Sequence, residues 1–446
     1  MSITSRRTWV FRPLYVDDYL MQDRLYVELY DYIIDFLHDD HSALRACSLV
    51  CQSWLPASRS HLFYHLALDY GDPRRIFTAI CSSPHIASYV NILSVQDSYR
   101  QGWIHGDIIF PLLLKKFIHL RELEFNLPVP GAKTLWSTTA FKDICDAMSS
   151  MSLQSFTLRQ FTFNSPHDFL KIFDTFRQVH TLQLDSVDIS IKAHLSVSPL
   201  EDLMNIFPTS THNGLVRKQA EIKRLLLRSA SLPIIIPILL HPRSPLSFST
   251  TTTLTMNMTM DNYDSMIKFL GRFPSLESLD LDIEPFCELL TLIRPVFITH
   301  TDSVDYEALL GQADIIDFKL LSALKSLSLQ LSILVARTDP ILWLLPCLAS
   351  AAPDNALEEL SLTCVIDKPP LSLTIQAFDN ILVGWRSLDE LLTQPPFEHL
   401  RRFRLDFALD NPIGDDAPRQ IADEFTKQLQ GLSRKGVLEV DVCEVW

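Results

Sequence analysis

The sequence predicts an α/β protein in which a small N-terminal helical module precedes an irregular, solenoid-like repeat body with a curved parallel sheet. Three observations lead to this prediction. Two short segments between residues 23 and 63 carry apolar residues at helical spacing. From residue 64 onward, an apolar-x-x-apolar-x-apolar pattern returns about every 34 residues, with helical segments between its copies. A composition of 47% hydrophobic and 21% charged residues is typical of a folded protein with a large core.

On this pattern the chain divides into an N-terminal arm (residues 1–22), a helical module (residues 23–63) and a repeat body (residues 64–446). The low glycine content, 11 residues, argues against long flexible linkers. The arm contains basic residues but lacks the apolar run of a secretion signal, so we expect no such signal.

The net charge, the apolar runs and the cysteine content limit the possible binding partners and the cellular compartment of the protein. The formal net charge of −14 opposes binding to nucleic acid or to an anionic membrane. The longest apolar runs, residues 234–240 and 341–352, are shorter than the roughly 20 residues that span a bilayer. Eight cysteines without a CxxC pair indicate neither a disulfide framework nor a zinc ribbon. We therefore predict a cytoplasmic and/or nuclear protein with no nucleic-acid or membrane partner.

The helical module begins with a predicted helix whose apolar face carries Leu29, Ile33, Phe36 and Leu37. A polar cluster then stops this helix and offers N-caps for the next one: Asp39, Asp40 and Ser42. The second predicted helix ends at Leu55, because Pro56 opposes its continuation. Its apolar surface consists of Leu44, Cys47, Leu49, Val50, Cys51 and Trp54. A unit this small cannot bury both faces alone, so we expect a partner surface to cover one of them.

The ordered residues of this module resemble the F-box. The family signature is Leu-Pro, a Glu two residues on, a first helix rich in Ile and Leu, and then Leu-Val-Cys followed by Trp. The corresponding residues here are Leu25, Tyr26, Glu28, Ile33, Ile34, Leu37, Leu49, Val50, Cys51 and Trp54. Tyr26 departs from the signature, because the family usually has proline there. The segment after the tryptophan is similar to the F-box proteins of mushroom-forming fungi, in Ser58, Arg59 and His61-Leu62-Phe63.

The resemblance implies that this module docks onto the Skp-type linker subunit, and through it onto a cullin. The residues it assigns to linker binding are Leu25, Glu28, Ile33, Ile34, Leu37, Leu44, Leu49, Val50, Cys51 and Trp54. The alternative is that the two amphipathic helices merely cap a core of their own chain. Cys47 and Cys51 share a predicted helix face, but a metal site would need two further ligands, so we expect no metal.

The repeat pattern predicts strands in which the last two apolar residues of each copy point to the same side. The clearest copies begin at Leu120, Leu153, Val179, Ile222, Leu276, Leu324, Leu357 and Leu400. Weaker copies begin at Phe63, Val90, Thr251 and Val437. N-caps of the intervening helices are expected at Asp72-Pro73, Ser165-Pro166 and Ser387. Strands with helical returns form a parallel sheet, and stacked repeats bury the faces that one repeat cannot bury alone.

This arrangement resembles the leucine-rich repeats found behind many F-boxes. The family's Asn, Cys or Thr three residues after the last leucine is missing. The residues found there instead are Val187, Ala230, Ser332, Val365 and Ala408. We therefore expect less uniform repeats, with loops or extra helices in the long intervals 189–212 and 284–315.

The residues between the inward leucines are expected to face the concave side of the sheet, two per repeat. The candidate substrate-binding residues on this side are Arg402, Arg404, Ser326, Ser328, Thr253 and Thr255. The arginine doublet suits a carboxylate or phosphate, and its change to glutamate is expected to weaken substrate capture. The alternative is a solvated sheet face without a ligand, which is also the interpretation we favour for Asp280 and Asp282.

No phosphate-binding glycine loop, HExxH helix or GxSxG elbow occurs, so we expect neither an enzyme nor a cofactor. The resemblance implies a substrate-recognition adaptor of a cullin-type (SCF) ubiquitin ligase, with a protein substrate on the repeat body. Two alternatives stay open. One is an F-box scaffold that works outside any ligase, and the other is an enzyme or GTPase regulator built on a repeat scaffold, with Arg404 or another residue acting directly.

Overall fold

The computed structural model describes the following residues: 27–69, 73–96, 109–126, 138–189, 219–229, 231–242, 244–258, 263–283, 316–333, 341–366, 383–409 and 417–444. The chain forms two compact units, Met1–His65 and Leu66–Trp446, which we call the head and the repeat body. Leu25 and Tyr26, for which the sequence predicts roles, lie outside the described residues. So do the two long intervals 189–212 and 284–315, except for Ile189.

The head contains three helices, α1 (Val27–Asp35), α2 (His41–Cys47) and α3 (Leu55–Leu62). Asp40 is the N-cap of α2, as predicted, and its carboxylate accepts hydrogen bonds from the Ser42 and Ala43 amides, both at 2.9 Å. The predicted extent of the second helix is wrong. It ends at Cys47, and Pro56 lies in the first turn of α3, where its fixed φ and missing N–H are tolerated.

A small core holds the head together. Ile34 and Leu44 are 0% exposed, and α3 contacts both other helices. The Tyr30 and Trp54 rings lie 5.6 Å apart, centroid to centroid. Asp35 Oδ1 pairs with His61 Nε2 at 2.7 Å and thereby joins α1 to α3.

The repeat body is built on a 12-stranded sheet, in which every pairing from the second strand to the last is parallel. In sheet order the strands are β1 (His65–Asp69), β2 (Ile92–Gln96), β3 (Glu122–Asn126), β4 (Ser155–Arg159), β6 (Thr181–Asp185), β9 (Arg224–Arg228), β11 (Thr253–Met258), β12 (Ser278–Ile283), β13 (Ser326–Ile333), β14 (Glu359–Ile366), β15 (Arg402–Leu409) and β16 (Leu438–Glu444). Each predicted copy of the repeat coincides with one of these strands.

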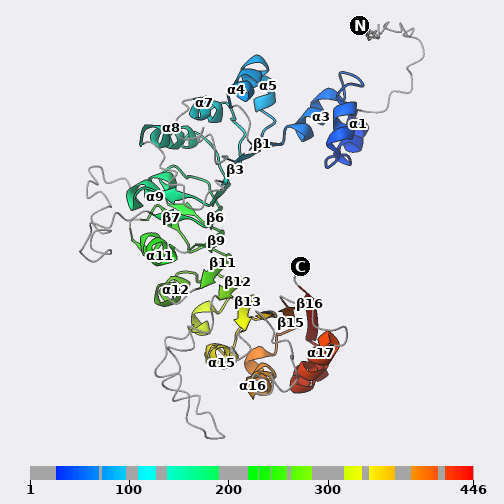
Figure 1. Cartoon of the computed structure of the whole chain (residues 1–446), viewed down its shortest axis with the longest axis vertical. Helices are drawn as coiled ribbons and strands as arrows, with labels where there is room; N and C mark the ends of the chain where they lie inside the picture. Colours follow the sequence, from blue (N-terminus) through cyan, green and yellow to red (C-terminus); the bar gives the residue numbers. More distant parts are fainter. Residues whose placement is uncertain are drawn as a thin grey trace, which may run out of the picture. The chain divides into compact units, whose positions relative to one another are not determined.

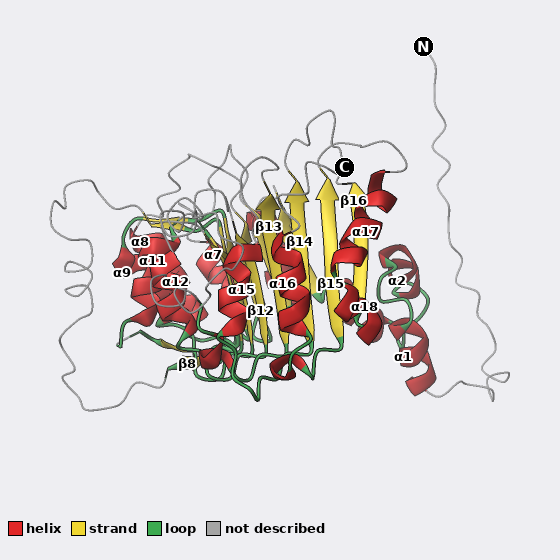
Figure 2. Ribbon diagram, turned by 90° about the horizontal axis from the view of Figure 1, so that it is seen from below, coloured by secondary structure: helices red, strands yellow, loops and turns green. Residues whose placement is uncertain are grey.

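The helices of the repeat body lie on one side of this sheet (Figures 1 and 2). They are α4 (Pro73–Ser82), α5 (Pro84–Ala87), α7 (Ile109–Leu114), α8 (Thr138–Met148), α9 (Pro166–Phe173), α11 (Leu232–Leu240), α12 (Tyr263–Leu270), α15 (Ile341–Ala349), α16 (Val383–Leu392), α17 (Ala417–Gln428) and α18 (Gln430–Lys435). Ser165 caps α9 as predicted, accepting from the Asp168 amide at 3.1 Å. The prediction at Ser387 is wrong, because α16 begins at Val383 and Ser387 lies inside it.

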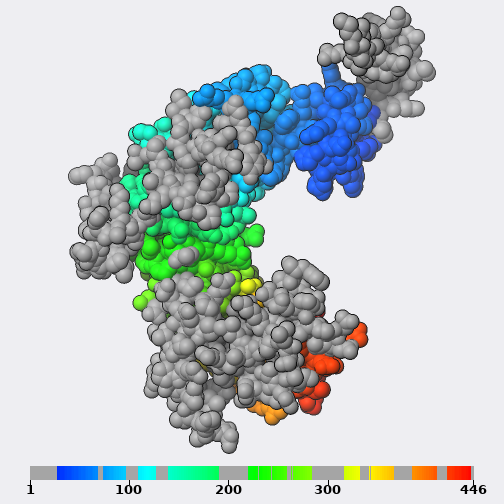
Figure 3. Space-filling model, in the orientation of Figure 1, coloured from blue at the N-terminus to red at the C-terminus, as the bar shows by residue number. Residues whose placement is uncertain are grey.

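Short elements complete the connections. The 3-10 turns η3 (Phe318–Leu321) and η5 (Pro395–Phe397) precede β13 and β15. Two further parallel pairs lie outside the main sheet: β5 (Thr162–Phe163) with β7 (Asp188–Ile189), and β8 (Ala220–Glu221) with β10 (Leu246–Ser247). Successive units follow one another in space in chain order, as the colours of the repeat body in Figure 3 show.

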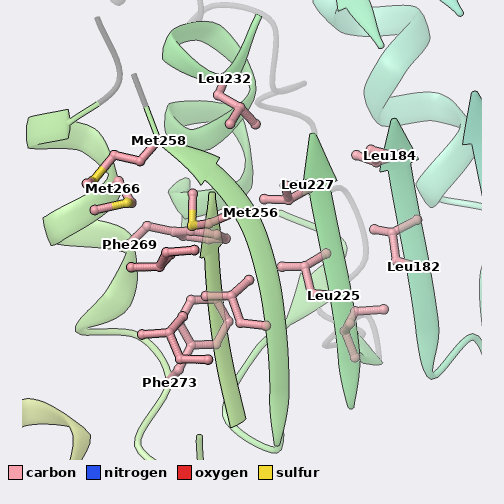
Figure 4. Packing of buried hydrophobic residues seen from close by; sticks show 14 of the residues in the cluster. Leu182, Leu184, Leu225, Leu227, Leu232, Met256, Met258, Met266, Phe269 and Phe273 are labelled. Atoms are coloured by element: carbon pink, nitrogen blue, oxygen red, sulfur yellow. The ribbon is translucent and has the colours of Figure 1, made fainter. Parts of the chain in front are cut away.

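The core lies between the sheet and its helices. Leu225 and Leu227 on β9 and Met256 on β11 are at most 2% exposed, and they point toward α11 and α12 (Figure 4). Phe269 of α12 and Phe273 of the turn after it pack into the same layer with their ring centroids 4.8 Å apart. Because side chains alternate along a strand, the residues between these apolar positions point away from the helices. We call that side of the sheet the open face.

From β2 onward, the strands are paired in a constant register that aligns the predicted copies, with one exception. Phe403 of β15 lies opposite Leu438, so β16 is shifted by two residues from the register that a copy starting at Val437 predicts. A two-residue shift leaves every side chain on its expected side of the sheet. In the described portion of the chain, no helix has the length and apolarity needed to cross a membrane.

Candidate partner-binding surfaces

The head exposes large apolar side chains on α1 and just after α2. Three of them lie on α1, and Phe36 continues their helical stripe in the turn directly after it: Leu29, Tyr32, Ile33 and Phe36. Phe36 is 72% exposed, and its ring meets Tyr32 edge-on at 4.9 Å. After α2, Leu49 is 86% exposed and Val50 62%. We call these six residues the head surface. Exposed apolar groups in this number are informative, because they indicate a binding surface.

The predicted linker-binding residues fall into two groups. Glu28, Ile33, Leu49, Val50 and Cys51 are exposed, and Leu37 and Trp54 are half-buried. Ile34 and Leu44 are fully buried and form the core of the head, so their side chains support the surface from below. Leu25 lies outside the described residues.

Cys51 and Trp54 lie in the turn that joins α2 to α3. The Cys51 Sγ lies 3.0 Å from Ser53 Oγ. The hydrogen bond from Ser53 lowers the pKa of the Cys51 thiol, with a further contribution from the Trp54 amide. The Trp54 indole packs against Tyr30 of its own head and stays half-buried, so part of it is accessible.

The open face of the sheet carries the predicted substrate-binding residues. Thr253 and Thr255 lie on β11, and Ser326 and Ser328 on β13, all half-buried as expected for one side of a close-packed sheet. Asp280 and Asp282 lie on this face of β12, as predicted. The register puts Thr253, Ser278 and Ser326 in one row across three strands, and Thr255, Asp280 and Ser328 in the next row.

Arg402 and Arg404 are exposed on β15, but each already pairs with a carboxylate of the same sheet. Arg402 Nη2 donates to Glu439 Oε2 at 2.7 Å, and Arg404 Nε pairs with Asp406 at 2.8 Å. These carboxylates raise the pKa of both guanidinium groups above its ordinary value. A substrate carboxylate at this doublet would have to compete with Glu439 and Asp406, so the two arginines remain candidates that each already have a carboxylate partner.

Sequence reasoning places Arg224 and Leu226 of β9 on the open face but misses Arg228, and with it a second arginine pair. The prediction named two open-face positions per repeat, but the strands expose a third one, immediately after the last inward leucine. On β9 the three positions are Arg224, Leu226 and Arg228, of which both arginines are exposed and Leu226 is half-buried. Continuing the alternation by one residue would have found Arg228.

Acidic residues flank this region along the sheet. Glu122 and Glu124 lie on β3, and Glu124 Oε1 pairs with Arg159 of β4 at 3.1 Å. On the other side, Asp280 and Asp282 lie on β12, two strands from β9. In the parts of the chain that the structure covers, no group of three or more His, Cys, Asp or Glu residues could hold a metal ion.

No protein-family model matches this chain, and no curated protein matches it. Its function is therefore argued from the two surfaces.

Proposed function

We propose that this protein is a protein-binding adaptor with two separate docking surfaces, the head surface and the open face of the sheet. Within that class, we propose an F-box protein with leucine-rich-repeat-like units that serves as a substrate receptor of a cullin-type ubiquitin ligase. The head binds the Skp-type linker, and the open face binds a protein substrate. The observation that carries the proposal is the head surface, with Leu49 86% and Phe36 72% exposed beside a filled core.

The head surface is not needed to fill the core of the head, since Ile34 and Leu44 already occupy it. Burying one large apolar side chain contributes about 1.5–3 kcal/mol, so six of them can stabilise a complex strongly when a partner covers them. The order of Leu49, Val50, Cys51 and Trp54 matches the F-box signature and supports the linker as that partner.

The repeat body supports the substrate-receptor half of the proposal. Its helices cover one side of the sheet (Figures 1 and 2), and none of the helices that the structure describes covers the polar open face. The strands lengthen along the chain, from five residues in β2 and β3 to eight in β13, β14 and β15. Such a surface suits a peptide or a loop of a folded protein, and transfer of ubiquitin by another subunit would then depend on proximity.

Capture of a purified Skp-type linker subunit by the full chain tests the proposal. We expect stable capture by the wild type and loss of it in the double variant Leu49→Glu, Val50→Glu, because charges would enter an apolar interface. The matched control is Ile118→Glu, Leu320→Glu, which changes two exposed apolar residues of the repeat body, 69% and 52% exposed. No capture by the wild type, or equal loss in both variants, would refute linker docking.

Two further assays separate the alternatives. Cullin-dependent ubiquitination of a bound protein distinguishes a ligase adaptor from an F-box scaffold that acts outside any ligase. Catalytic or GTPase-stimulating activity of the full chain without linker or cullin would instead favour an enzyme or regulator on a repeat scaffold.

A further inference from the structure

We infer that the open face across β6, β9 and β11 binds an extended, acidic segment of the partner protein, with Arg224 and Arg228 as its two anion-binding groups. This inference rests on the proposed function and specifies which substrate chemistry the open face takes. It commits to carboxylate side chains, carried by a protein segment.

The first argument is that both guanidinium groups are available. Arg224 and Arg228 are exposed, and neither forms an ion pair or a side-chain hydrogen bond with any residue inside the described ranges. Arg402 and Arg404, by contrast, are paired with Glu439 and Asp406. A carboxylate approaching β9 competes with no carboxylate already paired to these arginines within the described ranges, whereas one approaching β15 must displace a carboxylate of the sheet.

The second argument is the chemistry of the neighbouring strands. Arg224 lies between Thr181 of β6 and Thr253 of β11, and Leu226 lies between Gln183 and Thr255. Hydroxyl and amide groups can donate hydrogen bonds to a carboxylate or to a peptide backbone without repelling it. The predicted substrate-binding residues Thr253 and Thr255 thus adjoin the arginine pair.

The third argument is spacing. Arg224 and Arg228 are four residues apart on one strand, which separates their Cα atoms by about 13 Å. An extended peptide has the same period, so two acidic residues four positions apart can face the two arginines while the residue midway faces Leu226. An acidic-x-apolar-x-acidic pattern is complementary to this strand in both charge and apolarity.

Charge along the sheet confines such a segment to this place. Glu122 on β3 repels an acidic segment on one side, where Glu124 is paired with Arg159, and Asp280 and Asp282 repel it on the other. Asp185, which is in register with Arg228, is the nearest acidic neighbour of the pair, and Ser186 Oγ donates to it at 3.2 Å. Arg224 has threonines on both sides, so we assign it the stronger contact.

Fluorescence anisotropy with the full chain and a labelled Glu-Ser-Leu-Ser-Glu peptide tests the inference. The wild type should bind it at low ionic strength and lose affinity as salt rises. The double variant Arg224→Gln, Arg228→Gln should weaken binding by at least about tenfold. Arg177→Gln, Arg272→Gln is the matched control, because it removes the same charge from two arginines that are exposed in the turns after α9 and α12, and it should stay within about threefold of the wild type.

Several results would overturn the inference: no saturable binding of the acidic peptide, equal binding of a Gln-Ser-Leu-Ser-Gln peptide, or a loss in the control variant as large as that in the β9 variant. Binding of a phosphoserine analogue without binding of the glutamate peptide would overturn the assignment to carboxylates. Linker capture should be unchanged in the β9 variant. A β9 variant that still captures the linker but not the peptide supports the inference. Failure of the wild type to capture the linker would contradict the proposed function and leave the inference about the peptide untouched.

Discussion

Asp389 on α16 accepts a hydrogen bond from the backbone N–H of Gly431 in the first turn of α18, at 2.7 Å. Its second carboxylate oxygen accepts from the Leu432 amide at 2.8 Å. The N-cap residue of α18, Leu429, has no side-chain acceptor, so an acid from another helix satisfies the amides that a local cap would satisfy. Asp389 is only 9% exposed, which makes this contact a buried, charge-assisted link between the last two repeats.

Replacing Asp389 with alanine should destabilise this end of the repeat body. The change leaves two amides of α18 without acceptors in a largely buried position, which costs about 1–3 kcal/mol for each unsatisfied group. We expect a lower denaturant midpoint and faster hydrogen exchange in α18. Asp423→Ala, at an exposed position of α17, is the control and should change stability by less than about 0.5 kcal/mol. Equal effects of the two variants would argue against the cap.

Gly431→Ala should also destabilise the protein, although alanine is the better helix former by about 1 kcal/mol. A Cβ at this position would lie 2.8 Å from Asp389 Oδ2 and 2.8 Å from Thr393 Cγ2, so the carboxylate would have to move away from the amides that it caps. Gly271→Ala is the matched control, because the nearest atom to its Cβ would be at 3.6 Å, an ordinary contact. Thermal unfolding of both variants measures the difference, and a stability gain in Gly431→Ala would contradict the close approach.

The strands were predictable because their signal is local. A leucine at every second position in Leu279-Asp280-Leu281 or Leu327-Ser328-Leu329 leaves one orientation in which both leucines are buried. At β16 the apolar residues are Val437, Leu438, Val440 and Val442, and this near-continuous run fits two registers. Only pairing with β15 selects between them.

The contacts that join distant parts of the chain were not predictable from the same pattern. In the sequence, Asp389 is one polar position of an amphipathic helix, and no neighbouring residue indicates that its carboxylate contacts Gly431, 42 residues away. The role predicted for Pro56, the end of the second helix, is wrong for a different reason. Proline ends one helix and begins another equally well, and only the helical turns after it show which role it has. All residues of the head surface except Tyr32 belong to the apolar faces that the sequence predicts, but their degree of exposure depends on the three-dimensional packing of Ile34 and Leu44.

Ile33 and Ile34 are adjacent residues whose mutation should affect different properties, linker binding for Ile33 and stability of the head for Ile34. Ile34 is 0% exposed, so Ile34→Ala should lower the free energy of unfolding of the head by about 2–5 kcal/mol. Ile33 is 42% exposed, so Ile33→Ala should cost less than about 1 kcal/mol while weakening capture of the linker. Hydrogen exchange of peptides covering residues 27–62 measures the first effect, and a pull-down the second. A stable Ile34→Ala head with unchanged exchange would contradict the placement of the core.

Alkylation of cysteines provides a test of both units in one experiment. Burial raises the pKa of Cys145 to about 12 and that of Cys347 to about 12. At pH 8 only about one in ten thousand of these thiols is the reactive thiolate, so both should react with iodoacetamide only after unfolding. Cys51 is exposed and its pKa is lowered by the Ser53 hydrogen bond, so it should react first in the native protein.

Binding of the Skp-type linker should then protect Cys51 selectively, because this residue lies beside Leu49 and Val50 in the head surface. Cys81 is exposed on α4 of the repeat body and serves as the internal reference, whose alkylation rate should not change. Mass spectrometry of the two cysteine peptides, with and without linker, gives the ratio of rates directly. Equal protection of both cysteines would point to a global change in the chain, and protection of neither would place the linker elsewhere than on the turn between α2 and α3.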